Sequence, residues 1–150
     1  MTQQDLNHDI IIAAGRRVLE IEGSALTAFA NTLDASFAAA VDQMMNVKGR
    51  VIVCGIGKSG HVARKIAATL ASTGTPSQFL HASEAAHGDL GMVTMDDCVL
   101  VLSNSGETTE LSDVIRYTRR YRIPLIGMAS RTDSTLLKAS DIALLLPRAQ

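Results

Sequence analysis

The sequence predicts an α/β fold: a doubly wound, five-stranded parallel sheet flanked by helices and preceded by N-terminal helices. From residue 49 onward, short continuous apolar runs alternate with helical stretches, which is the pattern of buried parallel strands joined by crossover helices. Before that point, apolar residues recur at helical spacing. The chain has 150 residues, of which 47% are hydrophobic and 19% charged, which is enough for one ordinary core. We therefore expect a single domain, with helices over 1–47 and an α/β core over 48–150.

The N-terminal segment, residues 5–47, is predicted to form two helices. The break between them is expected near Asn31, because Asn31, Thr32 and Asp34 are capping types and a new apolar period opens at Thr32. The segment carries more apolar side chains than a sheet of short strands can cover. We therefore expect the chain to form a homo-oligomer.

The α/β core is predicted from alternating strand and helix patterns. The predicted strands are the apolar runs at 51–54, 77–80, 98–103, 125–129 and 142–146. The predicted helices between them cover 59–72, 83–90, 108–121 and 134–139. In such sheets the ligand lies at the carboxyl ends of the strands, near a topological switch point. We therefore expect the functional site just after Cys54, Leu80 and Ser103.

Charge and composition exclude several classes of function. The 14 basic and 15 acidic residues leave a net charge of -1, so no strong field attracts nucleic acid or an anionic membrane. Aromatic residues make up only 3% of the chain, so the stacking surfaces of single-strand binders are missing. Four arginines near the end of the 108–121 helix are interpreted as solvated side chains that complement the helix C-terminus. They are Arg116, Arg119, Arg120 and Arg122.

The cysteines and the N-terminus indicate the compartment. Cys54 and Cys98 lie inside apolar runs and form neither a C-x-x-C motif nor a disulfide framework, which predicts buried free thiols. Residues 1–9 lack the basic and apolar regions of a signal peptide, and no apolar stretch reaches the ~18 residues that a membrane span needs. We therefore expect a cytoplasmic protein with neither membrane nor nucleic-acid partners.

The loop after the third predicted strand has the composition of an anion-binding loop. Ser103, Ser105 and Thr108 place three hydroxyls within six residues, and Gly106 frees the backbone between them. The loop leads into the N-terminus of a helix, where backbone N–H groups favour a phosphate. A helix cap would need only one such side chain. The loop is therefore predicted to bind a phosphate group.

A glycine-rich turn follows the first predicted strand. Gly55, Gly57 and Gly60 satisfy the G-x-G-x-x-G pattern of dinucleotide-binding folds. The pattern is weak here, since a Rossmann site requires an acidic residue at the end of the second strand, where His81 stands. The phosphate loop of nucleotide triphosphatases is excluded, because Ile52 occupies the position of its first glycine. A Rossmann oxidoreductase that uses NAD stays as an alternative.

Two residue types at the strand ends suggest proton chemistry. Lys58 begins the first crossover helix, where its charge opposes the helix macrodipole, and such local conflicts often mark functional sites. His81 and His87 follow the second strand, and histidine titrates near neutrality, so both are candidate proton carriers. Their spacing could also indicate a metal, although no third ligand clusters with them. His61, inside the crossover helix, is interpreted as a packed or solvated residue.

Four blocks of the sequence together closely resemble the SIS (sugar isomerase) domain of bacterial arabinose-5-phosphate isomerases. They are Gly55–His61, Ala71–Pro76, Glu84–Met92 and Ser103–Glu107, and the resemblance covers nearly the whole chain. Many phosphosugar-binding SIS domains share the Ser-x-Ser-Gly-Glu-Thr loop, whereas the other blocks are typical of the isomerase branch. The resemblance implies interconversion of arabinose 5-phosphate and ribulose 5-phosphate, for synthesis of the lipopolysaccharide sugar Kdo. It also implies a cytoplasmic tetramer with the SIS fold.

The resemblance further implies roles for individual residues. The residues implied to be catalytic are Lys58, His87 and Glu110. Those implied to bind the phosphate are Ser59, Ser103, Ser105 and Thr108, and two further residues implied to bind the substrate are Gly57 and Asn104. Gly74, Thr75 and His81 are implied to line the sugar end. His81 can also hold a divalent metal that catalysis does not need, so no cofactor is expected to be required.

The family pattern continues past the last residue of this chain. It adds a glutamate after the fifth strand, a helical segment with a functional histidine and, usually, a pair of CBS modules. We therefore expect a SIS domain that is truncated at Gln150, separated from its CBS modules, and able to bind a sugar phosphate while isomerising it poorly. The alternative is a non-catalytic phosphosugar sensor, whose phosphate loop would look the same. A sensor would not need Lys58, His87 and Glu110, so this set favours the enzyme.

Overall fold

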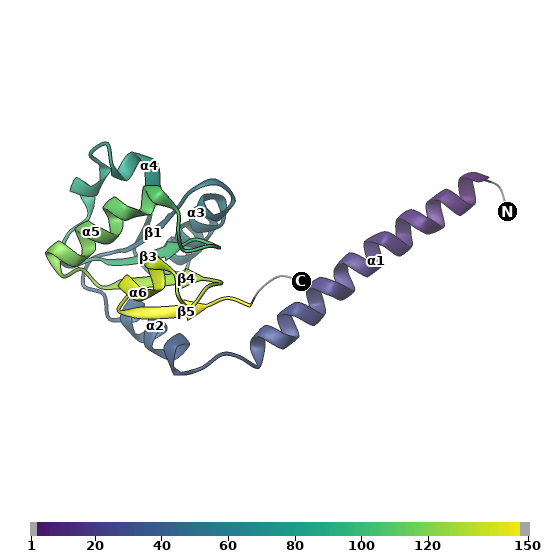
Figure 1. The fold of residues 1–150 in the computed structure, drawn as a ribbon, viewed down its shortest axis with the longest axis horizontal. Coiled ribbons are helices and arrows are strands. Elements are labelled where there is room, and N and C mark those ends of the chain that lie inside the picture. The colour runs from purple at the N-terminus through teal and green to yellow at the C-terminus, as the bar shows by residue number, and fades with distance from the viewer. Residues whose placement is uncertain (1–2, 148–150) are drawn as a thin grey trace. The chain divides into compact units, whose positions relative to one another are not determined.

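The computed structural model describes residues 3–147, with the backbone alone for residues 3–6. The chain falls into two units (Figure 1). The first ends at Leu33 and consists of the long helix α1 (Gln3–Ala30). The second begins at Asp34 and is the α/β domain, whose first element is helix α2 (Ala35–Met45).

Local capping chemistry ends α1 and begins α2. The backbone N–H and the hydroxyl of Thr32 both donate to the carbonyl of Phe29, at 2.9 and 2.8 Å. Asp34 is extended, and its carboxylate accepts the N–H of Ser36 at 2.8 Å, as expected of an N-cap. The break predicted near Asn31 is therefore confirmed.

Helix α1 exposes apolar side chains along its length. Ile10, Ile11, Leu19 and Leu26 are each 60–69% exposed within this single chain. Large apolar side chains gathered on one helix are typical of a surface that another protein surface covers. Among the residues that the structure describes, no helix is both long and apolar enough to cross a lipid bilayer.

The α/β domain contains the predicted five-stranded sheet, in which every pairing is parallel. The strand order is β2-β1-β3-β4-β5, the doubly wound order of flavodoxin-like folds. The strands are β1 (Val51–Gly55), β2 (Ser77–His81), β3 (Cys98–Leu102), β4 (Leu125–Ala129) and β5 (Ile142–Leu145). The principal crossover helices are α3 (Gly57–Ser72), α5 (Ser112–Tyr121) and α6 (Thr135–Ala139). The predicted fold class is confirmed.

Alternate residues of each central strand serve two separate cores. In β1, Ile52 and Cys54 pack with residues of α5 and α6 on one face of the sheet. Val51 and Val53 pack with residues of α2 and α3 on the other face. Strands β1 and β3 are fully buried, as expected of central parallel strands covered on both faces. Burial raises the pKa of the Cys54 thiol to about 12, and the free thiols of this chain are buried as predicted.

The prediction of a single helix over 83–90 is wrong. The structure instead has a four-residue helix, α4 (Ala82–Ala85), and a separate 3-10 turn, η1 (Asp89–Met92). Gly88 separates them with a φ of 121°, a conformation that no helix residue adopts. A 3-10 turn, η2 (Thr109–Leu111), likewise replaces the start of the predicted 108–121 helix.

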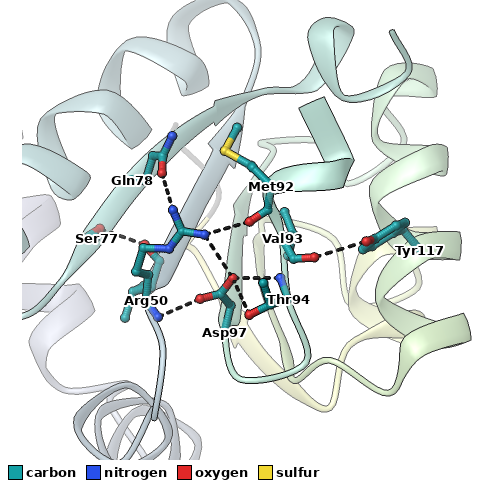
Figure 2. Close-up of polar contacts among 9 residues, drawn as sticks. Arg50, Ser77, Gln78, Met92, Val93, Thr94, Asp97 and Tyr117 are labelled. Carbon is teal, nitrogen blue, oxygen red and sulfur yellow. Dashed lines mark hydrogen bonds and ion pairs between the residues drawn. The ribbon is translucent and has the colours of Figure 1, made fainter. Parts of the chain in front are cut away.

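An ion pair between a half-buried arginine and a buried aspartate anchors the segment between β2 and β3 at the amino edge of the sheet (Figure 2). The carboxylate of Asp97 is 1% exposed and accepts the backbone N–H groups of Arg50 and Thr94, at 2.7 and 2.8 Å. The Arg50 guanidinium donates to Gln78 of β2 and to the carbonyl of Met92, both at 2.6 Å. The pair therefore connects β1, β2 and the end of η1.

Candidate functional site

The carboxyl ends of β1 and β3 form the topological switch point of the sheet. The chain leaves β1 through α3 towards β2 on one side, and it leaves β3 through α5 towards β4 on the other. Cys54 pairs with Val101, so the turn that begins at Gly55 and the loop that begins at Ser103 emerge side by side. Ligands of doubly wound sheets bind at this position. The two predicted loops are therefore neighbours.

The loop 103–108 turns its carbonyl groups towards the segment after β4. The carbonyl of Asn104 accepts the N–H and the hydroxyl of Ser130, at 2.9 and 2.7 Å. The carbonyl of Gly106 accepts the N–H of Leu136 in α6, at 3.0 Å. The oxygen atoms of these two peptide groups therefore point towards Ser130 and Leu136, and their partial negative charges are taken up by these hydrogen bonds.

The donors of the same loop remain available. Among the residues that the structure describes, the backbone N–H groups of Asn104, Ser105 and Thr108 have no hydrogen-bond acceptor. Asn104 and Ser105 are exposed, and Thr108 is half-buried. Successive free N–H groups in one turn make an anion-binding concavity. The loop can therefore receive an oxyanion such as a phosphate.

Ser103 has a structural task within this loop. Its side chain is buried, and its hydroxyl accepts the N–H of Gly106 at 3.1 Å. The same oxygen lies 2.9 Å from the hydroxyl oxygen of Thr108. Ser105, by contrast, is exposed, and its hydroxyl oxygen accepts the N–H of Glu107 while its own proton has no fixed acceptor. Of the two serines, Ser105 is therefore the freer donor to a ligand.

A second group of donors begins α3. Ile56 is the N-cap of this helix, and no side chain caps it. Gly57 has a φ of +57°, which turns the chain from β1 into the helix. Lys58 is exposed and Ser59 half-buried in the first helical turn, next to the switch point. These residues add an ammonium group, a hydroxyl and helix-terminal N–H groups to the same edge of the sheet.

The other two residues predicted to be catalytic also follow strands at the carboxyl edge. Glu110 lies in η2, directly after the anion-binding loop, and its side chain is exposed. His87 is exposed in the turn after α4, and its N–H donates to the carbonyl of Glu84 at 2.9 Å. The segments that follow β2 and β3 therefore carry a histidine and a glutamate, which are residue types that can transfer protons.

His81, the last residue of β2, has an incompletely satisfied side chain. Its buried Nδ1 atom has no hydrogen-bond partner among the described residues, and its ring packs edge-on against Phe79 with centroids 6.2 Å apart. Residues 7–147 contain no group of three His, Cys, Asp or Glu side chains that could hold a metal ion. We assign no step to a metal.

Gly74 and Thr75 lie at the opposite edge of the sheet. They follow α3 and precede β2, where the carbonyl of Pro76 accepts the N–H of Val51, the first residue of β1, at 2.9 Å. The other predicted site residues follow the carboxyl ends of strands. Within one copy of the chain, these two residues are therefore not brought to the switch point.

The structure adds supporting residues that the sequence analysis missed. Ser130 holds the carbonyl of Asn104, and Glu107 accepts the N–H and the hydroxyl of Thr135 at 2.9 and 2.7 Å. Each of these contacts joins residues 26 or 28 positions apart. A local motif carries no signal for such partners, so only the folded chain reveals them.

Comparisons with known proteins show which proteins this chain is similar to. The arabinose 5-phosphate isomerase KdsD of Shigella flexneri is 49% identical over 131 residues, which are 87% of this chain and 40% of that protein. The same enzyme of Escherichia coli K12 is 48% identical over equal shares. This chain thus spans about two fifths of the length of these relatives. The structure of E. coli CFT073 c3406 in complex with arabinose 5-phosphate is similar, with a TM-score of 0.85 and 38% identity, covering 98% of this chain and 76% of that one.

A family model supplies the remaining comparison. The SIS domain model matches residues 43–150, which include all five strands and both loops of the switch point. The match begins within α2 and therefore covers most of the α/β domain described above. Together with the parallel sheet and the relatives at nearly half identity, it shows that this chain belongs to the SIS domain family.

Proposed function

We propose that this chain is the SIS domain of an enzyme that interconverts arabinose 5-phosphate and ribulose 5-phosphate. The observation that carries the proposal is the loop 103–108, in which the N–H groups of Asn104, Ser105 and Thr108 have no acceptor among the described residues while the carbonyls of Asn104 and Gly106 are bonded to the segment after β4. The relatives named arabinose 5-phosphate isomerase, at up to 49% identity, support the choice of substrate. The pathway we propose is the synthesis of Kdo for lipopolysaccharide.

The proposed reaction moves a proton between two neighbouring carbons of the open-chain sugar. Glu110 removes the proton from C2 of the aldose, and the electrons of that bond form an enediolate with the carbonyl oxygen. Lys58 stabilises the negative charge on this oxygen, and the proton returns at C1 to give the ketose. His87 shuttles protons between the sugar hydroxyls, including the one needed for ring opening. The steps use no metal, and a divalent ion on His81 would have no part in them.

Phosphate binding anchors the reacting carbons. The loop 103–108 would hold the distal phosphate, and Ser59 at the start of α3 would contribute a second hydroxyl from the adjacent strand end. Binding energy from a part of the substrate that does not react can then keep C1 and C2 in register with the base. Glu110 follows this loop by two residues, so the anchor and the base share one short segment.

The proposed enzyme works as a homo-oligomer, and we propose a tetramer in the cytoplasm. The exposed apolar side chains of α1 provide a surface that other copies can cover. Gly74 and Thr75, which lie away from the switch point of their own copy, would line the sugar end of a neighbouring copy's site. The buried free thiols of Cys54 and Cys98 suit a reducing compartment. Light scattering on the purified chain measures the assembly, and a monomer would contradict it.

Replacing Ser105 with alanine is expected to weaken the binding of arabinose 5-phosphate. The change removes one exposed hydroxyl that would donate to the phosphate, and a charge-assisted hydrogen bond is worth about 1.5–3 kcal/mol. Calorimetric titration of the 150-residue chain measures the affinity. Ser77→Ala is the control, because Ser77 lies at the amino edge of the sheet, where its hydroxyl donates to the carbonyl of Val51. Equal affinities for the wild type and Ser105→Ala would show that the loop acts only as a helix cap.

Replacing Glu110 with glutamine is expected to lower kcat by about 10²–10⁴ with little change in substrate affinity. Glutamine keeps the shape and hydrogen-bonding capacity of the side chain and removes the base. A coupled isomerase assay with arabinose 5-phosphate on the full-length protein measures the effect. Asp113→Asn, one turn further along in α5, is the control for the loss of a nearby negative charge. Turnover by Glu110→Gln at the wild-type rate would remove Glu110 from the mechanism, and a wild-type protein that binds without turnover would be a sensor.

A further inference from the structure

Glu107 places a carboxylate inside a loop that otherwise offers donors to an anion. The side chain is exposed, and a negative charge there repels a phosphate that approaches the loop. Its oxygens, however, are both bonded to Thr135, the first residue of α6. One oxygen accepts the N–H of Thr135 at 2.9 Å and the other accepts its hydroxyl at 2.7 Å. The Thr135 hydroxyl and N–H together lower the pKa of Glu107, so the carboxylate remains charged under ordinary conditions.

The contacts of Glu107 with Thr135 lie directly beside another hydrogen bond between the loop and α6. Gly106 precedes Glu107, and its carbonyl accepts the N–H of Leu136 at 3.0 Å. Ser134 caps α6 by accepting the N–H of Leu137 with its own side chain. Helix α6 therefore has its own cap, and the contact from Glu107 is not needed to begin it. The contact instead holds the backbone at residue 107 against α6.

We infer that Glu107 is a positioning residue that, through Thr135, holds the loop 103–108 in the conformation that receives a phosphate. The inference rests on the proposed function, because it presumes that this loop binds the sugar phosphate. Without the attachment, residues 107 and 108 can turn, and the free N–H of Thr108 leaves the donor set shared with Asn104 and Ser105. Glu107 makes no contact with the substrate in this arrangement and acts only through the loop.

Two replacements of Glu107 separate positioning from charge, because they have opposite expected effects. Glu107→Gln keeps both contacts, since its oxygen accepts the N–H of Thr135 and its NH₂ group donates to the hydroxyl oxygen. Glu107→Ala removes both contacts together with the charge. If Glu107 acted only as a charge, both variants would bind phosphate more tightly than the wild type. If it positions the loop, the alanine variant binds more weakly while the glutamine variant binds at least as tightly as the wild type.

The experiment is a titration of the 150-residue chain with inorganic phosphate and, separately, with arabinose 5-phosphate, followed by the amide NMR shifts of residues 104–108. We expect Glu107→Ala to raise both dissociation constants about tenfold, the order of one or two lost hydrogen bonds. We expect Glu107→Gln to leave them unchanged or lower. Thr135→Val, which removes only the hydroxyl donor, should raise them less than Glu107→Ala, and Thr135→Ser should restore them. The effects of Glu107→Ala and Thr135→Val should not add in the double variant, since the hydroxyl contact that Thr135→Val removes is already lost in Glu107→Ala.

Lys138→Gly is the matched control for the stability of α6. It weakens the short helix at an exposed position without touching the loop. If Lys138→Gly raises the dissociation constants as much as Glu107→Ala does, the positioning role is overturned. It is also overturned if the wild type binds phosphate and Glu107→Ala binds it equally or more tightly, which leaves the proposed function intact. A wild-type chain that binds neither probe overturns the proposed phosphate site itself, and the positioning role with it.

Discussion

Gly106→Ala is expected to lower the free energy of unfolding by about 2–5 kcal/mol, because it combines backbone strain with overpacking. Gly106 has a φ of +68°, a region that residues with a Cβ adopt at a cost of about 1–2 kcal/mol. A methyl group at this position would also lie 2.5 Å from the Cβ of Ser134 and 3.2 Å from that of Ala129. Ser134 is fully buried and caps α6, so it cannot move aside without breaking that helix. The loop should lose its shape, and phosphate binding with it.

Gly57→Ala is the matched control for the steric part of this prediction. Gly57 has a similar φ of +57°, but a Cβ there meets no atom within 4 Å. Only the strain of about 1–2 kcal/mol should therefore appear. Equilibrium unfolding in urea, monitored by circular dichroism, gives the free energy for both variants. Equal decreases in the free energy of unfolding for Gly57→Ala and Gly106→Ala would show that the close approach of the new methyl group to Ser134 does not destabilise the fold.

Asp97→Ala is expected to lower the free energy of unfolding by about 2–4 kcal/mol, because it removes a buried carboxylate together with the charged hydrogen bonds that this carboxylate accepts. The Asp97 carboxylate accepts the N–H groups of Arg50 and Thr94 and the Thr94 hydroxyl, and it forms an ion pair with the Arg50 guanidinium at 3.4 Å (Figure 2). Alanine leaves these donors without the buried carboxylate that accepts from them, although Thr94 and the Arg50 guanidinium keep partial access to water. Asp133→Ala is the control, because Asp133 pairs with Arg131 on the open surface, where little stability is at stake.

The same carboxylate should make stability depend on pH. Burial by itself raises the pKa of Asp97, but the hydrogen bonds from Thr94 and Arg50 and the Arg50 charge outweigh it, so the pKa lies below its usual range. A group whose pKa is lower in the folded state stabilises that state above the unfolded pKa, and this contribution disappears as the pH falls through the folded pKa. The wild type should therefore lose stability as the pH falls below about 5. Asp97→Asn, measured by urea unfolding at several pH values, should show a smaller loss, and an unchanged slope would exclude Asp97 as its source.

Most of the sheet could be predicted from the sequence because its signals are local. Strands β1 and β3 are continuous apolar runs with buried side chains on both faces, and the structure places them within a residue of the prediction. The sequence placed the site after Cys54, Leu80 and Ser103, and the strand order of the folded sheet then puts the switch point between β1 and β3. The prediction failed at 83–90, where alanines with high helix propensity stand before Gly88. A single glycine conformation there overrides the propensity of its neighbours.

Within the candidate site, the sequence alone determined the chemistry of the residues, and the tertiary structure decided what each is free to do. The hydroxyls of Ser103, Ser105 and Thr108 indicate an anion-binding loop from their composition, since residue type sets which donors exist. Only the fold decides that the Ser103 hydroxyl is used internally, that the Glu107 carboxylate is bonded to Thr135 of α6, and that Gly74 lies at the far edge of the sheet. The physical reason is that these assignments depend on contacts between residues far apart in the chain or on which end of a strand a turn occupies. Residue types carry donors, acceptors and propensities, whereas distance and direction arise only when parallel strands bring separate segments to one edge of the sheet.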